Sequence, residues 1–227
     1  MESLTVAHLS DQFDAPLGTA ERPSWRGRLH VIGLAAAVPA FALLLAVANG
    51  ARARVGVVIY AAGLCSMFVT SATYHRWVHT IRARQRWRRA DHAMIFAAIA
   101  GSFTPMCLLT VPDRFGIPLL LLVWVGGIAG MAMKIAGWRH QRIAGGIMYI
   151  ALGWVGAFAI PEVWRSAGVW PAVLVLIGGV CYTVGAVWLL RKWPKLRPHV
   201  FSYHEVWHVW TVVAAAAHFA AVWMIVE

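Results

Sequence analysis

The last apolar segment of the sequence carries two histidines whose spacing suits metal binding. His204 and His208 are one helical turn apart, so a helix would present both imidazoles on the same face. Imidazole nitrogens are common zinc ligands, and two on one face can reach a single ion. Few polar side chains occur in the apolar segments of this chain, so the pair predicts part of a metal site.

The same residues also match H-E-x-x-H, the metalloprotease signature in which Glu205 would be the general base. The sequence counts against this alternative, an intramembrane protease. Only 19 residues follow His208, and no glycine turn separates it from His218 as the longer metzincin pattern requires. His75 already offers a third ligand from another segment. Glu205 is rotated by about 100° from His204 on a helix, so we expect it to face arginines at the membrane surface.

Two other apolar segments have polar side chains near one end. Ser71 and His75 are four residues apart and share a helix face, with Ser71 one turn deeper. Asp91 opens the third apolar segment. Considered singly, His75 is a structural histidine at a membrane surface, and Asp91 is a carboxylate at a helix start or a partner of Arg88 or Arg89. Whether they share a site with the last segment depends on topology.

The elements that position these residues follow from composition. The chain has 227 residues, of which 60% are hydrophobic and 13% charged, whereas a soluble domain carries roughly a quarter charged residues. Each apolar segment is long enough to cross a hydrocarbon core of about 30 Å as a helix. We therefore predict an all-α polytopic membrane protein, with a polar cytoplasmic tail over 1–24 and a seven-transmembrane-helix bundle over 25–227. The predicted helices span 29–48, 54–75, 91–111, 116–136, 142–161, 169–190 and 200–226.

The basic residues predict the orientation and exclude one class of partner. A formal net charge of +11 would suit nucleic acid binding, but the basic residues lie in short loops between apolar segments, so we expect no nucleic acid partner. Placing the N-terminus in the cytoplasm puts 16 of the 20 lysines and arginines inside and 4 outside. Because cytoplasmic loops carry such an excess, we predict a cytoplasmic N-terminus and an outside C-terminus.

This topology gathers the polar residues of three helices in one layer. His75 falls at the cytoplasmic end of the second helix, Asp91 at the start of the third, and His204 and His208 at the start of the seventh. Three neutral imidazoles with an open fourth position make a catalytic zinc site. We predict that Asp91 orients or deprotonates the water that zinc activates, and that Ser71 hydrogen-bonds to this water or to a substrate carbonyl.

The remaining histidines are weaker candidates. His218 lies 14 residues beyond His204, roughly 21 Å along a helix, so it cannot share the metal and we expect it to bond a neighbouring helix. His30 begins the first helix on the cytoplasmic side, where we expect a structural role, with contact behind the metal ligands left open. Four others border loops, and we expect them to be solvated: His79, His92, His140 and His199.

Several motifs together resemble the hemolysin III family. They are Ser71–His75, Asp91 leading to Ala100–Pro105, and His204–His208 followed by Ala214–His218. That family belongs with the progestin and adipoQ receptors, which include the adiponectin receptors. The resemblance covers nearly all of the chain after residue 22. It extends to two further stretches, Arg26–His30 and Tyr149–Gly153.

The resemblance implies a seven-helix bundle with a cytoplasmic N-terminus. It implies zinc held by His75, His204 and His208, with Asp91 acting through a water and Ser71 nearby, and this sequence keeps all five residues. The family is also similar to alkaline ceramidases, which suggests hydrolysis of a lipid amide or ester. Its bacterial members are called hemolysins, which suggests cell lysis.

Three functions remain as hypotheses. The first is a zinc-dependent, ceramidase-like hydrolase of a lipid amide or related acyl bond, multi-pass in a cell membrane such as the bacterial plasma membrane. The second is a non-enzymatic lipid-responsive receptor or membrane-homeostasis factor with structural zinc. The third is a pore-forming cytolysin, for which the sequence shows neither an amphipathic insertion segment nor a secretion signal. The expected partner is a membrane lipid or lipid-like substrate, and a homo-oligomer stays open.

Overall fold

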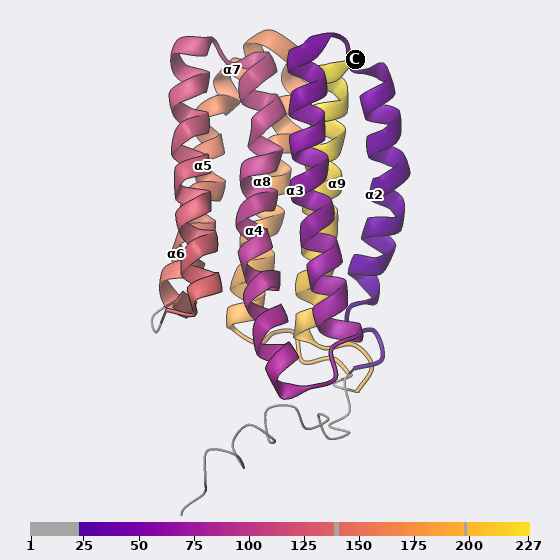
Figure 1. Cartoon of the computed structure of the whole chain (residues 1–227). Helices are drawn as coiled ribbons and strands as arrows, with labels where there is room; N and C mark the ends of the chain where they lie inside the picture. Colours follow the sequence, from indigo (N-terminus) through magenta and orange to yellow (C-terminus); the bar gives the residue numbers. More distant parts are fainter. Residues whose placement is uncertain (1–22, 139–140, 198) are drawn as a thin grey trace, which may run out of the picture.

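The computed structural model describes residues 23–138, 141–197 and 199–227 (Figure 1). Within these ranges the chain is helical apart from loops and isolated bridge residues, such as those that pair Arg197 with Phe201. The division into a tail over 1–24 and a membrane domain over 25–227 stays a prediction, because most of the tail lies outside the described residues, as do Arg22, Arg139 and His140. The helices are α2 (Arg28–Val47), α3 (Gly50–Arg76), α4 (Ile81–Thr110), α5 (Asp113–Ala136), α6 (Gln141–Val155), the 3-10 helix η1 (Gly156–Ala159), α7 (Ile160–Ala167), α8 (Val169–Leu190) and α9 (Tyr203–Val226).

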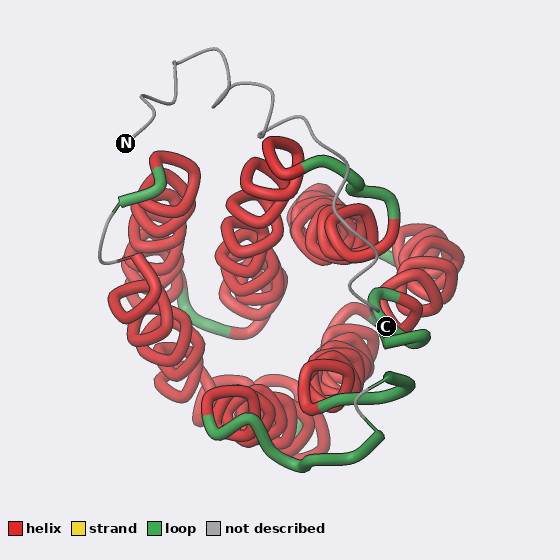
Figure 2. The backbone as a smooth tube through the Cα atoms, turned by 90° about the horizontal axis from the view of Figure 1, so that it is seen from below, coloured by secondary structure: helices red, strands yellow, loops and turns green. Residues whose placement is uncertain are grey.

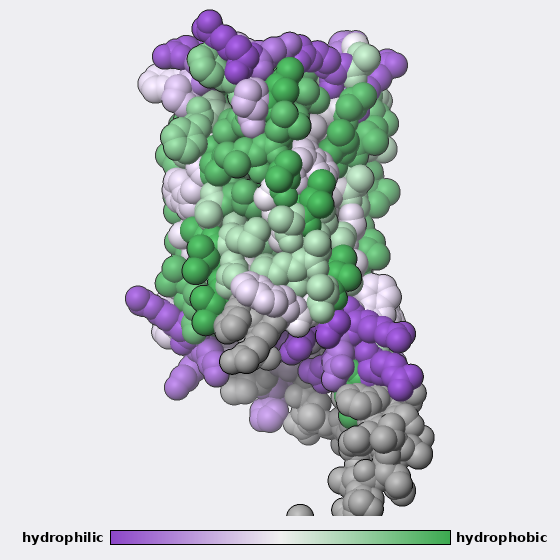
Figure 3. All heavy atoms as spheres, turned by 60° about the vertical axis from the view of Figure 1, so that its left-hand side comes forward, coloured by the Kyte–Doolittle hydropathy of each residue, from purple (hydrophilic) through white to green (hydrophobic). Residues whose placement is uncertain are grey.

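These helices form seven stretches that are long and apolar enough to cross a membrane, with α6, η1 and α7 making one of them. Figure 3 shows, on the face in view, an apolar band between two hydrophilic rims. Large apolar side chains point outward within it, as at Leu121, Ile147 and Phe158, which are 59%, 64% and 78% exposed. Lipid is the natural solvent of such a surface. The predicted seven-helix membrane bundle is therefore confirmed.

The long helices pack side by side with alternating direction (Figure 1). Seen along their axes, the helices form a rounded bundle rather than a flat layer (Figure 2). The helix pairs α3–α4, α8–α9 and α4–α5 make the most extensive contacts. At Gly63 a Cβ atom would clash with the carbonyl of Ala97, so glycine allows α3 and α4 to approach this closely. The N-terminal end of α2, the C-terminal end of α3 and the N-terminal ends of α4 and α9 all lie at the lower end of Figure 1.

Helix α4 begins ten residues before the predicted start at 91. The Thr80 side chain caps it by accepting a hydrogen bond from the Ala83 backbone N–H (3.3 Å), and the basic stretch 82–89 forms its first turns. Arginine favours helix but not hydrocarbon, so hydropathy detects only the membrane-embedded part. The interpretation of Asp91 as a helix-start carboxylate is therefore wrong, because Asp91 lies about three turns inside the helix.

The predicted helix over 142–161 is also interrupted. Its α-helical part ends at Val155, and Gly156–Ala159 forms a 3-10 turn before α7 begins. Pro161 stands in the first turn of α7, where its missing N–H costs nothing because the first N–H groups of a helix lack intrahelical partners. By contrast, the predicted helix over 169–190 coincides with α8.

Candidate metal centre

Three histidines from two helices converge at the lower end of the bundle. His75 stands in the last turn of α3, and His204 and His208 in the first two turns of α9. One ligand nitrogen from each lies within 4.8 Å of the others, and the Nε2 atoms of His75 and His204 are 3.1 Å apart. His75 and His208 are buried and His204 is half-buried. The structure thus brings together the three predicted metal ligands.

This donor set fits a transition metal ion. Two nitrogens that bind a tetrahedral zinc at 2.0–2.1 Å lie about 3.3 Å apart, close to the observed separation of the two Nε2 atoms. Imidazole suits zinc, copper, iron and nickel. Three imidazoles without a fourth protein ligand in the group leave a coordination position for a reactant. The group could hold a metal ion, and its three nitrogens do not by themselves select which one.

The chain that precedes α2 covers His75. Gly27 there has a left-handed backbone (φ 76°), and a Cβ atom on it would lie 2.8 Å from the Cβ of His75. Glycine is therefore required at position 27 for two reasons, the left-handed backbone conformation and the close approach to His75. This contact holds the start of α2 against the end of α3, where His75 is placed.

The first turn of α9 is fixed by a capping box. The Ser202 hydroxyl accepts a hydrogen bond from the His204 backbone N–H (3.3 Å), and the Glu205 carboxylate accepts one from the Ser202 backbone N–H (2.7 Å). Glu205 also pairs with the guanidinium of Arg26 and is only 1% exposed. The expectation that Glu205 faces an arginine is confirmed. Because both carboxylate oxygens are engaged away from the three histidines, Glu205 is not placed as a protease general base.

Ser71 and Asp91 meet beside this cluster. Ser71 lies one turn deeper than His75 on α3 and is buried, and its hydroxyl is positioned to donate a hydrogen bond to the carboxylate of Asp91 on α4. Asp91 itself is half-buried. This interaction links α3 to α4 and places a carboxylate near the face of α3 that carries His75. The catalytic roles predicted for Ser71 and Asp91 stay predictions.

Sequence reasoning missed two residues near the site. His92, expected to be solvated at a loop border, instead lies inside α4, where it is half-buried and near enough to interact electrostatically with His75 and His204. Its position follows from the early start of α4. Tyr149 of α6 donates a hydrogen bond from its hydroxyl to the backbone carbonyl of His92 (2.6 Å). A lone tyrosine in an apolar segment was the available signal, since a buried hydroxyl needs a partner.

The other histidines largely follow expectation. His79 and His199 are exposed. His218 lies 3.1 Å through its Nε2 from the backbone carbonyl of Val175 and so links α9 to α8. His30 is buried, stacks on His208 with ring centroids 3.9 Å apart, and lies 3.1 Å through its Nε2 from the Thr211 hydroxyl. These contacts give His218 and His30 the structural roles expected of them.

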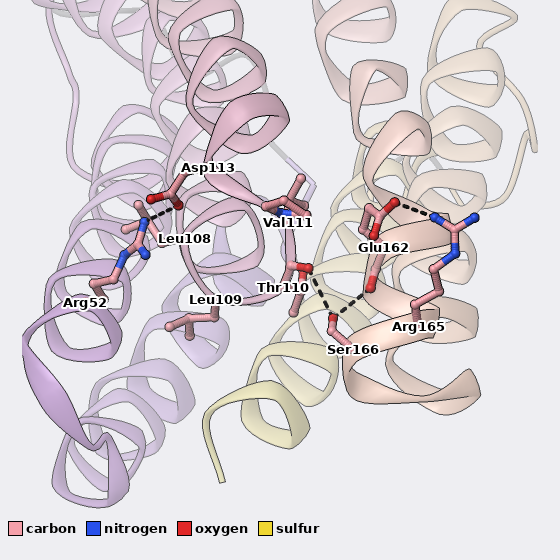
Figure 4. Close-up of a pocket in the computed structure, with 10 residues that line it drawn as sticks. Arg52, Leu108, Leu109, Thr110, Val111, Asp113, Glu162, Arg165 and Ser166 are labelled. Atoms are coloured by element: carbon pink, nitrogen blue, oxygen red, sulfur yellow. Dashed lines mark hydrogen bonds and ion pairs between the residues drawn. The ribbon is translucent and has the colours of Figure 1, made fainter.

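A surface hollow lies at the opposite end of the bundle, between α3, α4, α5 and α7 (Figure 4). Two ion pairs border it, Arg52 with Asp113 and Arg165 with Glu162. The Ser166 hydroxyl lies within hydrogen-bonding distance of the backbone carbonyls of Thr110 and Glu162, and Figure 4 marks these contacts and the two ion pairs with dashed lines. None of the predicted site residues lines the hollow.

Comparison with known proteins adds independent evidence. Residues 19–219, which include all five predicted site residues, match the family described as Haemolysin-III related. Hemolysin-3 of Bacillus cereus is 30% identical over 196 residues, covering 85% of this chain and 86% of that protein. Hemolysin-3 homolog of Bacillus subtilis (strain 168) is 26% identical over 196 residues, with coverage of 85% and 89%. Heptahelical transmembrane protein ADIPOR2 of Oryza sativa subsp. japonica is 29% identical over 183 residues, with coverage of 72% and 79%.

Proposed function

This chain belongs to the hemolysin III family of the progestin and adipoQ receptor superfamily, and we propose that it is a zinc-dependent hydrolase of a lipid amide or acyl bond. It is a multi-pass cell membrane protein. The observation that carries the proposal is the convergence of three imidazoles, with Ser71 one helical turn from His75 on α3 and interacting with Asp91 of α4. An ion-binding group beside a carboxylate is the minimum equipment of a metal-assisted hydrolase.

His75, His204 and His208 would hold the ion. Zinc, when bound, supplies a Lewis acid that polarises a carbonyl and makes a nearby water acidic at neutral pH. The protein's own contribution is to place these nitrogens from two helices at one depth and to keep the cluster largely out of bulk water. His30 packs against His208 and restricts the orientation of that ring.

Asp91 and Ser71 would carry the proton chemistry. Asp91 takes a proton from the attacking water and returns it to the leaving amine or alkoxide as the acyl bond breaks. Ser71 orients that carboxylate through its hydrogen bond. If its hydroxyl turns toward the substrate during the reaction, it donates a hydrogen bond to the oxyanion that forms on the carbonyl oxygen.

The expected substrate is a membrane lipid, because the site lies at one end of helices that cross the membrane. The distribution of lysine and arginine supports a cytoplasmic N-terminus, which would put the cluster on the cytoplasmic side. A lipid amide there would present its carbonyl near the headgroup level, at the depth of the cluster. A homo-oligomer of the chain stays a prediction.

Replacing Asp91 by Asn tests the proposal. The variant keeps the shape of the side chain and loses the base, so we expect zinc content to be retained while fatty acid release from a short-chain ceramide falls roughly 10²- to 10⁴-fold. Zinc is measured by elemental analysis of detergent-purified protein and fatty acid by mass spectrometry. Zinc-loaded wild type that releases no fatty acid from ceramides or related lipid amides would refute the hydrolase.

One observation favours a second candidate, a lipid-responsive receptor or homeostasis factor with structural zinc. The Ser71–Asp91 hydrogen bond joins α3 to α4, so the same residues have a use without chemistry. In that case Asp91→Asn lowers thermal stability, and neither wild type nor variant hydrolyses lipid. The two functions are therefore distinguished by comparing Asp91→Asn with wild type. A hydrolase loses lipid hydrolysis in the variant, whereas a receptor loses thermal stability and has no hydrolysis to lose.

A further inference from the structure

His30 is the most unusual buried polar residue near the cluster. It stands in the first turn of α2 and is only 3% exposed. One face of its ring stacks on His208 at 3.9 Å between centroids, and the ring of Phe68 lies 5.2 Å away at a tilt of 58°. The predicted structural role accounts for this stacking and for the contact of its Nε2 with Thr211. It leaves the other ring nitrogen unexplained.

The hydrogen bonds of Thr211 determine which nitrogen of His30 carries the proton. The Thr211 hydroxyl lies 2.8 Å from the backbone carbonyl of His208, which can only accept, so the single hydroxyl hydrogen is used there. The Nε2 of His30 lies 3.1 Å from the same hydroxyl oxygen and must then donate to it. In the neutral ring, Nδ1 is consequently a bare lone pair, able only to accept.

This lone pair has no protein partner. Among the residues that the structure describes, Nδ1 of His30 is the one buried side-chain nitrogen or oxygen without a hydrogen bond. Phe68 has no donor, and the stacked His208 presents the face of its ring rather than an N–H. Leaving a buried acceptor without a donor destabilises the fold, so such groups are rare unless something outside the chain donates to them.

We propose that His30 is a binding residue whose Nδ1 accepts a hydrogen bond from a hydroxyl group held inside the bundle next to His208. The hydroxyl comes either from an ordered water or from the polar headgroup of a bound lipid, which offer the same donor chemistry. His30 is not among the three clustered ligands, so this subsite is separate from the metal position. The proposal does not depend on hydrolysis and holds equally for a receptor.

The test reads the tautomer and the hydrogen bond directly. The protein is labelled with ¹⁵N-histidine, purified in detergent, stripped of lipid and loaded with zinc, and its imidazole nitrogens are observed by NMR. The signal of His30 is assigned by its disappearance in His30→Gln, with His30→Phe as a second variant in case the first does not fold. We expect Nε2 protonated and Nδ1 as an acceptor shifted toward lower frequency by a hydrogen bond.

Adding a short-chain ceramide separates the two sources. A Nδ1 shift that is present without lipid and unchanged by ceramide supports water. A shift that appears only with ceramide, and not with a fatty acid methyl ester that has no hydroxyl, supports a lipid headgroup. A protonated Nδ1, or a free Nδ1 lone pair under both conditions, overturns the proposal.

The variant His30→Phe adds a readout on the ligand. It keeps an aromatic ring against His208 and removes the acceptor, so zinc content is expected to equal that of wild type. If the donor is a lipid hydroxyl, binding of radiolabelled short-chain ceramide weakens roughly five- to tenfold, as expected for one lost hydrogen bond. Loss of zinc from this variant would show that His30 holds the metal instead and would overturn the separate subsite.

Discussion

At the lower end of the bundle His75, His204 and His208 meet in a largely buried cluster, whereas at the upper end Arg52 and Asp113 pair in the open. The two members of the upper pair are 55% and 60% exposed and 2.6 Å apart. The upper end also has a surface hollow, which the second ion pair, Arg165 with Glu162, lines as well (Figure 4). The upper end is thus marked by its shape, and the histidine end by buried polar side chains.

The two ends of the bundle also differ in the energetics of their polar groups. Exposed ion pairs are satisfied by each other and by water, and contribute about 0–1 kcal/mol. Buried polar groups within a membrane protein are expensive and persist where they pair or bind something. The three imidazoles, the Ser71–Asp91 pair and the unpaired nitrogen of His30 all lie at the histidine end. Burial and convergence of donors, rather than concavity, are the grounds on which the functional site is proposed at the histidine end.

Removing one of the three proposed metal ligands should give the largest effect. His208→Ala leaves two imidazoles, and we expect zinc affinity to fall by more than the roughly 10- to 100-fold that loss of an outer partner costs. Zinc bound by the detergent-purified protein is measured after dialysis against a weak chelator. His79→Ala is the matched control, since His79 is exposed near the same end of the bundle. Equal zinc content in wild type, His79→Ala and His208→Ala would show that His208 does not hold the metal. The proposed metal site would then no longer distinguish the histidine end from the upper end.

Breaking the partly buried ion pair of Arg26 and Glu205 should have the next largest effect. Glu205→Ala strips Arg26 and the Ser202 backbone N–H of their partner, and we expect unfolding to become easier by about 3 kcal/mol. Thermal unfolding in detergent measures the loss, and zinc content at low temperature should be retained. A stable, zinc-loaded Glu205→Gln that has lost all hydrolysis would instead restore Glu205 as a general base.

The matched change at the upper end should have the smallest effect. Asp113→Ala removes the partner of Arg52, and we expect a loss below about 1 kcal/mol that shrinks further in high salt. The same unfolding measurement applies, alongside Glu205→Ala. A loss as large as that of Glu205→Ala would mean that the upper hollow is a structural centre in its own right.

Sequence periodicity and hydropathy predicted some features closely and others poorly, for identifiable reasons. The predicted helix over 169–190 coincides with α8 because nearly every residue there is apolar. The start of α4 at Ile81 was not predicted because its first turns are basic. These turns are helical, but hydropathy detects only the apolar part of the helix. His92 was misplaced as a consequence, since a residue assigned to a loop border was expected to meet water.

The sequence by itself determined the number of membrane-spanning segments and the identity of the metal-competent residues. Both depend on local properties, namely the length of an apolar run and the spacing of side chains along one helix. The partnerships between helices were decided only by the tertiary structure. His75 meets His204 across 129 residues, Arg26 finds Glu205 across 179, and His30 stacks on His208. These contacts arise because burying the helix faces against one another brings distant segments to the same depth, and local sequence does not encode which faces will meet.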